Sequence, residues 1–451
     1  MVESYANSVE DKLIDGLSFK LESGASYIHD RRSVSFHPSG SNIYNSKTGT
    51  KFIRIALTGK DWLDPGTFRV CMDVQNTDKV ETISGTAREP YLRPLSGPWC
   101  LFRRIRLLAG SQVIEDIDQY SRVHQMMDIL TAKDSRRNEV VEGFGYLWDE
   151  HATDPVKLLH TGIAPSDYQT VMFKPLCGLL NQNKFLPLEY LQSLILELEL
   201  IDDPADAVVA NIGQFTSANN SLLWELRNVQ VKCDVISLDS SVNESYHRVL
   251  MTSKEIPIHY NTLTSQYQTI TENPFINVSR AATRLKSILV TLDKDATTAL
   301  PATAGRKAWN SFYSPASVNN RSTTQFKHNS ADEFELAVQI GSKTFPDGNP
   351  IRSHAEAYYQ LRKALGVQSS IVHSFDISPQ EYRDDRFVMA LDLEKSLGAS
   401  FTGLNTRSGD LMTVKFKYKD ASADRIANRM HIVLHTDNIL QIMLTGATVY
   451  D

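Results

Sequence analysis

Short runs in which apolar and polar residues alternate recur along almost the whole chain. In the first half they cover residues 51–59, 67–75, 101–109, 170–176, 193–201 and 224–238. In the second half they cover residues 284–292, 333–340, 386–394, 411–419 and 430–444. Alternation with a period of two is typical of strands that bury one face, and Gly, Pro, Asn and Asp separate the runs. The pattern predicts a protein built mainly from β-strands.

Helical patterns are few. Three segments have them, namely 118–131, 239–251 and 353–365. Many short strands with turn residues between them favour a β-sandwich or jelly roll over a parallel α/β sheet.

One unit of this pattern occurs twice. "RIRLLAGSQVIEDIDQYSRVHQMMDIL" starts at residue 104 and "LAVQIGSKTFPDGNPIRSHAEAYYQLRKAL" at residue 336. Each predicts a strand, a Gly-Ser turn at Gly110 or Gly341, a short strand, a bend and a helix. Farther along, 171–173 and 388–390 are 217 residues apart, and "SLILELEL" and "DLMTVKFK" are about 218 apart. We therefore predict two copies of one β-domain, with Gly110 and Gly341 in equivalent hairpins.

The repeat sets the expected domain boundaries. We predict an N-terminal arm at 1–28, a first jelly roll at 29–238, a linker with a helix at 239–260 and a second jelly roll at 261–451. The polar segment 293–332 has no apolar periodicity, so we expect it on the outer, solvent-facing end of the second jelly roll.

Composition limits the protein class. The chain has 451 residues, which is longer than a domain with a single hydrophobic core usually is. It has 41% hydrophobic and 22% charged residues, as an ordinary globular protein does. Its net charge is −6 and it has no basic block, which argues against a protein whose main task is to neutralise phosphates. We expect no signal peptide and no membrane span, since no apolar run approaches about 20 residues. Four widely spaced cysteines form neither a disulfide framework nor a zinc pattern, so a reducing cytosol or nucleus fits best.

The titratable residues give no firm catalytic signal. Glu115, Asp116 and Asp118 could form an acid–base cluster, but an ion pair with Arg122, or a place at a helix N-terminus, is the favoured interpretation. His124 and Met127 share a predicted helix face. His431 and His435 share a strand face about 13 Å apart, too far for one metal ion, so we expect histidines with ordinary partners.

Two further groups have ordinary explanations. Asp384 and Asp385, between Arg383 and Arg386, predict a solvated charged turn. The five tryptophans could stack on sugars, but core positions are favoured; they are Trp62, Trp99, Trp148, Trp224 and Trp309. No GxSxG, GxxxxGK[ST] or GxGxxG motif occurs. We therefore expect no enzyme activity and no catalytic, cofactor or metal site.

The order of motifs resembles that of a known family. In the first half, "KFIRIALTGKDWLDPGTFRVCMDVQN", "LFRRIRLLAGSQVIEDIDQYSRVHQMMDILT" and "VMFKPLCGLLNQNKFLPLEYLQSLILELEL" are similar to the first domain of double jelly-roll major capsid proteins. In the second half, "INVSRAATRLKSILVTL", "YYQLRKALG" and "FVMALDLEKSLGASFTGLNTRSGDLMTVKFKYK" resemble the second domain. The resemblance spans about 30–451 and is nearest to Polinton-like viruses and adintoviruses, and more distant to giant (nucleocytoplasmic large DNA) viruses. It is weakest at 132–168 and 293–332.

This resemblance implies a fold and a role. The fold is all-β, with two tandem eight-stranded jelly rolls, a few short helices and long loops. The role is that of a major capsid protein whose homotrimers form pseudo-hexagonal capsomers of an icosahedral double-stranded DNA virus. The implied partners are the chain itself, neighbouring capsomers, and penton and minor or cement capsid proteins, without sequence-specific nucleic acid. The implied location is the virion, assembled in the host cytoplasm or nucleus.

Two alternatives from other classes remain open. One is a cellular glycan- or protein-binding β-sandwich module, which predicts a monomer or small oligomer. The other is a two-jelly-roll hydrolase of glycoconjugates, which needs two carboxylates about 5 to 9.5 Å apart in a groove.

Overall fold

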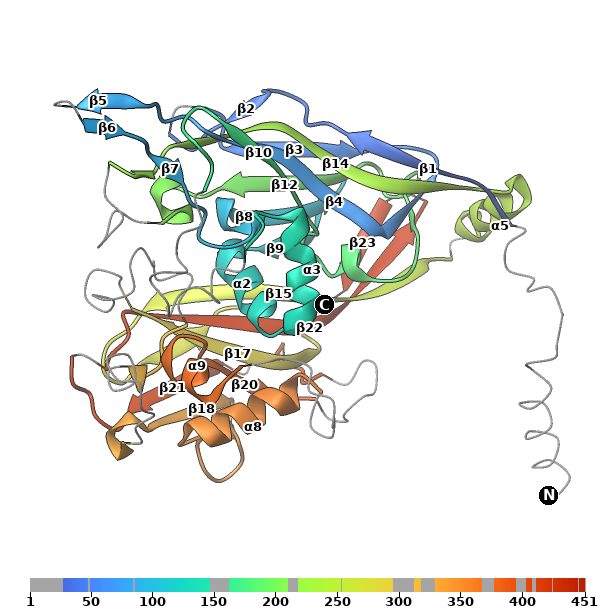
Figure 1. Cartoon of the computed structure of the whole chain (residues 1–451). Coiled ribbons are helices and arrows are strands. Elements are labelled where there is room, and N and C mark those ends of the chain that lie inside the picture. The colour runs from blue at the N-terminus through green and yellow to red at the C-terminus, as the bar shows by residue number, and fades with distance from the viewer. Residues whose placement is uncertain are drawn as a thin grey trace, which may run out of the picture.

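The computed structural model describes most of the chain. The described residues are 27–47, 49–83, 86–146, 162–209, 218–252, 254–294, 312–317, 329–366, 377–394, 403–407, 411–423, 425–444 and 446–450. Their strands form two β-sandwiches, one above the other in Figure 1.

The first sandwich, which we call the first jelly roll, consists of two antiparallel sheets. One sheet has the order β1 (Ile28–Phe36), β14 (Trp224–Leu238), β4 (Trp62–Asn76) and β10 (Tyr168–Phe173), with the short strands β2 (Ile43–Tyr44) and β11 (Leu186–Pro187) beside it. The other has the order β3 (Phe52–Leu57), β12 (Leu194–Leu200), β8 (Phe102–Ala109) and β9 (Gln112–Ile117). Alternate residues of β3 and β4 are buried between the sheets, as the period of two predicts.

The second sandwich, the second jelly roll, has the same strand order. One sheet runs β15 (Ile256–Thr269), β22 (Arg429–Met443), β17 (Leu285–Asp293) and β20 (Val388–Asp392), and β23 (Gly446–Tyr450) extends it beside β22. The other runs β16 (Phe275–Val278), β21 (Met412–Tyr418), β18 (Phe334–Ile340) and β19 (Lys343–Phe345). Each of the eight strands in the two sheet orders of the first jelly roll thus has a counterpart at the same sheet position. This confirms the prediction of two eight-stranded jelly rolls.

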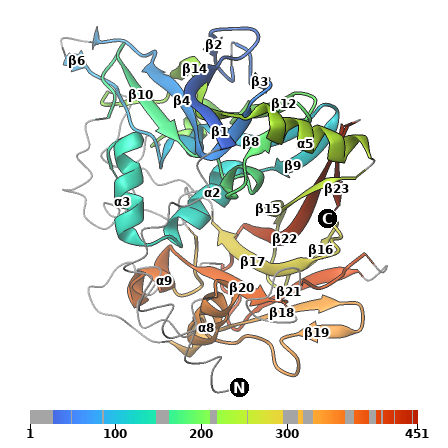
Figure 2. The ribbon, with the colours of Figure 1, turned by 90° about the vertical axis from the view of Figure 1, so that its right-hand side faces the viewer.

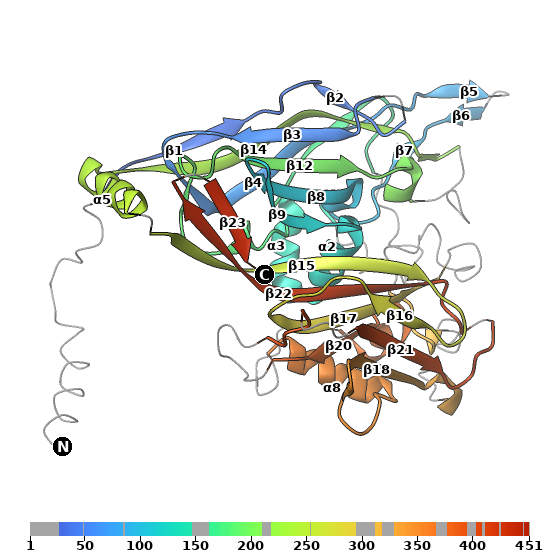
Figure 3. The same ribbon diagram turned by 180° about the vertical axis from the view of Figure 1, so that it is seen from behind.

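Shorter elements connect these strands. They are β5 (Glu81–Ile83), β6 (Thr86–Arg88), β7 (Tyr91–Leu92) and β13 (Asn220–Ser221), and the 3-10 helices η3 (Pro98–Leu101), η4 (Leu179–Asn181), η5 (Pro204–Ala207) and η7 (Ser330–Asp332). The strands β5 and β6 project from one end of the first jelly roll (Figure 3).

The three predicted helices are present within two residues of their expected ends. They are α2 (Tyr120–Ile129), α5 (Ser240–Met251) and α8 (His354–Ala364). The side chains of Asp239 and Ser353 accept hydrogen bonds from the first free backbone N–H groups of α5 and α8. Two further helices, α3 (Lys133–Glu142) and α9 (Pro379–Asp384), were not predicted.

Strand register corrects the repeat alignment by one residue. The core-facing residues Leu194 and Leu196 of β12 correspond to Met412 and Val414 of β21, an offset of 218. The same offset places the paired residues Asp73 and Thr170 on Thr291 and Val388, which are also paired. The predicted offset of 217 for 171–173 and 388–390 is therefore wrong, because a slip of one residue exchanges the two faces of a strand.

The two Gly-Ser turns lie in equivalent hairpins, as predicted. Gly110 joins β8 to β9 with φ +58°, and Gly341 joins β18 to β19 with φ +59°. The next helices are α2 and α8 respectively.

Replacement of Gly110 or Gly341 by valine should lower the free energy of unfolding by more than 1 kcal/mol. Only glycine adopts positive φ without a steric cost, and β-branched residues are the least tolerant. Urea titration at fixed protein concentration measures the change. Gly59→Val is the control, because Gly59 does not have positive φ and a Cβ there would first meet Leu188 Cδ1 at 3.7 Å. Equal losses in all three variants would contradict the turn assignment.

Two strands cross predicted boundaries. The strand β15 begins at Ile256, inside the range 239–260 predicted as a linker. Of the predicted arm 1–28, only Tyr27 and Ile28 are described, and Ile28 already belongs to β1. The rest of the arm lies outside the described residues.

The predicted solvent loop 293–332 is partly buried. Residues 312–317 are described, and Phe312, Tyr313 and Ala316 are almost fully buried. The Tyr313 N–H donates to the Leu292 carbonyl, and the Phe312 N–H donates to that of Asp385. The expectation that the whole segment faces solvent is therefore wrong for 312–317.

Candidate functional site

Contacts between the two jelly rolls form a junction. In Figures 1 and 2 the first jelly roll lies above the second, with α2 between them and β9 near β15. The Tyr260 hydroxyl of β15 donates to the Ile114 carbonyl of β9 at 3.1 Å. The Ser265 hydroxyl donates to the Asp118 carbonyl. Side chains of β15, the first strand of the second jelly roll, thus bond to β9, an edge strand of the first, and to the residue that follows it.

A buried ionic group lies at the centre of this junction. Arg122 on α2 forms an ion pair with Asp293 at the end of β17, and both side chains are almost fully buried. Arg122 also donates to Thr291 Oγ1 and to the Leu292 carbonyl, each at 3.2 Å. Its guanidinium lies 4.4 Å from the centre of the Phe312 ring. One side chain of the first jelly roll therefore bonds three consecutive residues of the second.

His431 completes this group. Its Nε2 lies 2.7 Å from Asp293 Oδ2. Burial lowers the pKa of His431, so the ring is neutral at pH 7 and its Nε2–H donates to Asp293. Asp293 thus forms an ion pair with Arg122 of the first jelly roll and a hydrogen bond with His431 of the second.

A second buried contact centres on Glu115 of β9. Its carboxylate accepts from the backbone N–H of Gly178 at 2.9 Å and of Leu179 at 2.7 Å. It also accepts from the Thr262 hydroxyl of β15 at 2.9 Å. Burial raises the pKa of Glu115 to about 7, against the opposing effect of these three donors.

This raised pKa predicts that stability falls as pH rises. In the unfolded chain the carboxyl loses its proton near pH 4.5, and in the folded chain near pH 7. Between these values the folded state binds more protons, so the free energy of unfolding decreases with pH, by a few kcal/mol over the window. Glu115→Gln cannot titrate, so its stability relative to the natural protein should improve from pH 5 to pH 8. Urea titrations at both pH values measure this, and a constant difference would contradict the shift.

Gly178 makes the closest backbone approach of the junction. A Cβ at this position would lie 1.4 Å from the carbonyl oxygen of Asn261 on β15. Only glycine lets the segment before η4 reach β15 and direct its N–H groups at Glu115.

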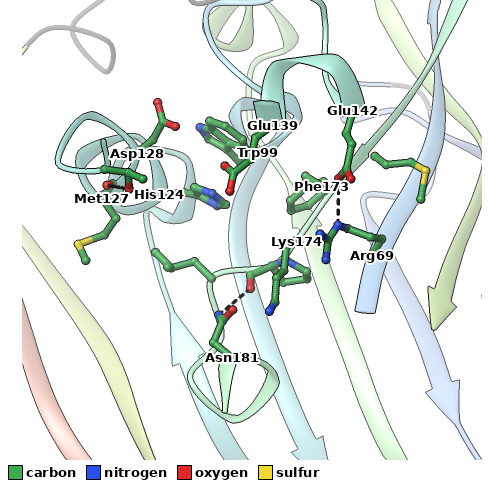
Figure 4. A pocket seen from close by; sticks show the side chains of 14 residues that line it. Arg69, Trp99, His124, Met127, Asp128, Glu139, Glu142, Phe173, Lys174 and Asn181 are labelled. Carbon is green, nitrogen blue, oxygen red and sulfur yellow. Dashed lines mark hydrogen bonds and ion pairs between the residues drawn. The ribbon is translucent and has the colours of Figure 1, made fainter. Parts of the chain in front are cut away.

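A side-chain cluster outside the junction lines a cavity of about 170 Å³ between α2, α3, β4 and β10 (Figure 4). His124 stacks on Trp99 with ring centres 4.1 Å apart. Tyr120 accepts from the Leu176 N–H at 2.8 Å and its hydroxyl lies 2.8 Å from His124 Nδ1. Burial lowers the pKa of His124 to about 3, so it is a neutral histidine with an ordinary partner, as predicted.

The predicted pairing of the acidic cluster with Arg122 is wrong. Glu115 bonds to backbone N–H groups of the junction, and Asp116 forms two hydrogen bonds with Arg104, at 2.7 and 2.5 Å. The partner of Arg122 is Asp293 instead. These carboxylates have separate partners, so they give the hydrolase alternative no support.

The predicted solvated turn at 383–386 is also wrong. Asp385 and Arg386 are buried, because residues 312–317 cover them. The Ser314 N–H and the Ser317 hydroxyl both donate to the Asp384 carbonyl.

The other candidates have ordinary roles. Trp62 donates to Asn243 and Trp224 to the Pro204 carbonyl, and both rings are buried, as predicted. His435 lies 3.4 Å from Ser287 Oγ. Trp148 and Trp309 lie outside the described residues. The four cysteines are buried and unpaired. The described part of the chain holds no group of His, Cys, Asp and Glu suited to a metal ion.

Comparison with known proteins supports the fold through structure alone. No protein-family model and no curated protein sequence matches the chain. PBCV-1 VP54, fitted into a reconstruction of the virophage Sputnik, matches with a TM-score of 0.61 and 13% identity, covering 96% of this chain and 98% of that one. The Sputnik virophage structure matches with a TM-score of 0.60 and 9% identity, covering 96% and 90%. The Faustovirus major capsid protein matches with a TM-score of 0.57 and 10% identity, covering 95% and 94%. These matches cover both jelly rolls, so the chain has the double jelly-roll fold of these viral proteins.

Proposed function

We propose that the chain is a major capsid protein whose homotrimers form pseudo-hexagonal capsomers of an icosahedral double-stranded DNA virus shell. The observation that carries this proposal is the junction. Two jelly rolls of identical strand order are held at a fixed angle by the buried Arg122–Asp293 pair and the Glu115 contacts. Each subunit therefore has two similar flanks, and three subunits have six, as a hexagonally packed capsomer requires. The similarity to the Faustovirus major capsid protein supports the same role.

The proposed partners and location follow from this role. Its partners would be neighbouring capsomers together with penton and minor or cement proteins, and its location would be the virion. The net charge of −6 suits a shell that does not bind DNA through a basic surface. Among the described helices, none has the length and apolar character needed to cross a membrane.

The oligomeric mass tests this proposal. Size-exclusion chromatography with light scattering should give three times the 50.7 kDa of the chain at micromolar concentration. Permanent interfaces bury about 2,000–5,000 Å², which keeps such trimers together on dilution. Negative-stain images should have a six-sided outline. A folded monomer would contradict the proposal and favour the glycan- or protein-binding module.

A further inference from the structure

We propose that the outer face of the sheet β14-β4-β10 is the surface that receives the next subunit, and that the β19–β20 connection of a second copy, with α8, occupies it. This inference rests on the proposed function, because it names the contact by which the trimer closes. It follows from the internal repeat together with the contacts of the junction.

Within one chain, the β9–β10 connection of the first jelly roll contacts the outer face of the second. Arg122 belongs to that connection and bonds to Thr291 on the outer row of β17. The neighbours of Thr291 in this part of the face are Leu289 on β17 and Val388 on β20, and all three are buried. This face of the second jelly roll is therefore already occupied.

The offset of 218 residues identifies the matching face of the first jelly roll. Leu289, Thr291 and Val388 correspond to Cys71, Asp73 and Thr170. Asp73 is half-buried and Thr170 is exposed. Cys71 is buried. The counterpart of the occupied face is therefore open in a single chain at Asp73 and Thr170.

A hollow lies at this corresponding position. It has a volume of about 420 Å³, and Cys71, Asp73 and Thr170 are among its lining residues, together with Tyr44 and Lys232. Asp73 accepts from the Thr170 hydroxyl and from the Asn228 amide, each at 2.6 Å. A carboxylate has about four acceptor sites, so Asp73 can accept a further donor from a partner.

The second jelly roll carries the matching element on its opposite side. The helix α8 follows β19 as α2 follows β9. Its Tyr359 side chain is 60% exposed and carries a phenol donor. In a closed ring of six similar jelly rolls, the contact within a chain recurs between chains. The β19–β20 connection then meets the β14-β4-β10 face of the next copy. We assign Tyr359 to this contact because it is the large apolar side chain that α8 leaves exposed.

Charge substitutions on the two faces test this contact. Thr170→Glu and Tyr359→Glu each place a second negative charge near Asp73, so each variant should run as a monomer in light scattering. Thr170→Lys combined with Tyr359→Glu should restore the trimer. The control is Phe275→Glu on β16, where an aromatic side chain that is 66% exposed lies on the other sheet, and it should stay trimeric.

A cross-linking experiment keeps the test independent of folding defects. The double variant Thr170→Cys/Tyr359→Cys, treated with a short thiol-to-thiol cross-linker, should give a covalent ladder that ends at three chains. Each single cysteine variant should give no trimer band. If the natural protein is trimeric but the glutamate variants stay trimeric and no ladder forms, the proposed surface is wrong while the proposed function stands. If the natural protein is monomeric, both fail.

Discussion

Replacing Gly178 with alanine is expected to lower the free energy of unfolding by about 3 kcal/mol or more. Gly178 has φ −63° and ψ −39°, a conformation that alanine adopts readily, so the backbone itself presents no obstacle. Elsewhere such a change slightly stabilises a protein by restricting the unfolded chain. Here the new Cβ would lie 1.4 Å from the Asn261 carbonyl oxygen, and backbone atoms on one side must move. Overpacking of this kind usually costs 1–3 kcal/mol, and the movement also weakens the Glu115 contacts.

The matched control is Gly59→Ala. A Cβ at Gly59 would meet Leu188 Cδ1 at 3.7 Å, an ordinary van der Waals contact, so its effect should stay within about 0.5 kcal/mol. Urea titration of the two variants at the same protein concentration measures the difference. Limited proteolysis of Gly178→Ala should cut between the jelly rolls, near α5, faster than in the natural protein. Equal stability of the two variants would show that the jelly rolls do not meet at Gly178.

The strands were predictable because each buries one face. The regular alternation of β3 and β18 between buried and other positions comes directly from the sheet, so the sequence pattern contains it. Two edge strands lack this signal: β1 is exposed along most of its length, and β15 is rich in Thr, Ser, Gln and Asn. The helix α3 buries only Arg136, so it has no apolar stripe to find.

The junction was not predictable from local patterns. Arg122 lies 171 positions from Asp293, and the nearby carboxylates at 115–118 offered closer partners in sequence. Fold geometry decides otherwise, because α2 directs Arg122 toward the second jelly roll while Asp116 pairs with Arg104 on the neighbouring strand. Burial of 383–386 was missed for the same reason, since its cover comes from residues 312–317. In the sequence, the only sign of a close contact at Gly178 is that it is a glycine, just before η4. That the contact is with Asn261 follows only from the three-dimensional structure.

Replacing Arg122 is expected to lower the free energy of unfolding by about as much as Gly178→Ala does. The cause here is a buried charge without its partner, not a steric clash. Arg122→Met leaves the Asp293 carboxylate buried without its cationic partner, which typically costs 3–5 kcal/mol. The double variant Arg122→Met/Asp293→Leu buries neither charge, so it should recover much of this loss. The exposed pair between Arg352 and Glu335 supplies the control, since Arg352→Met should cost less than about 1 kcal/mol.

A double-mutant cycle measured by urea titration gives the coupling energy between Arg122 and Asp293. We expect the two single variants to be far from additive, because each leaves one buried charge that the double variant removes. The proposed trimer should also respond, since a subunit whose jelly rolls can rotate against each other no longer presents its two flanks at a fixed angle. Arg122→Met should therefore shift light-scattering mass toward the monomer at low micromolar concentration, while Arg352→Met stays trimeric. Additive energies with an unchanged trimer would show that the ion pair is incidental and that the apolar contacts and Glu115 alone set the angle between the jelly rolls.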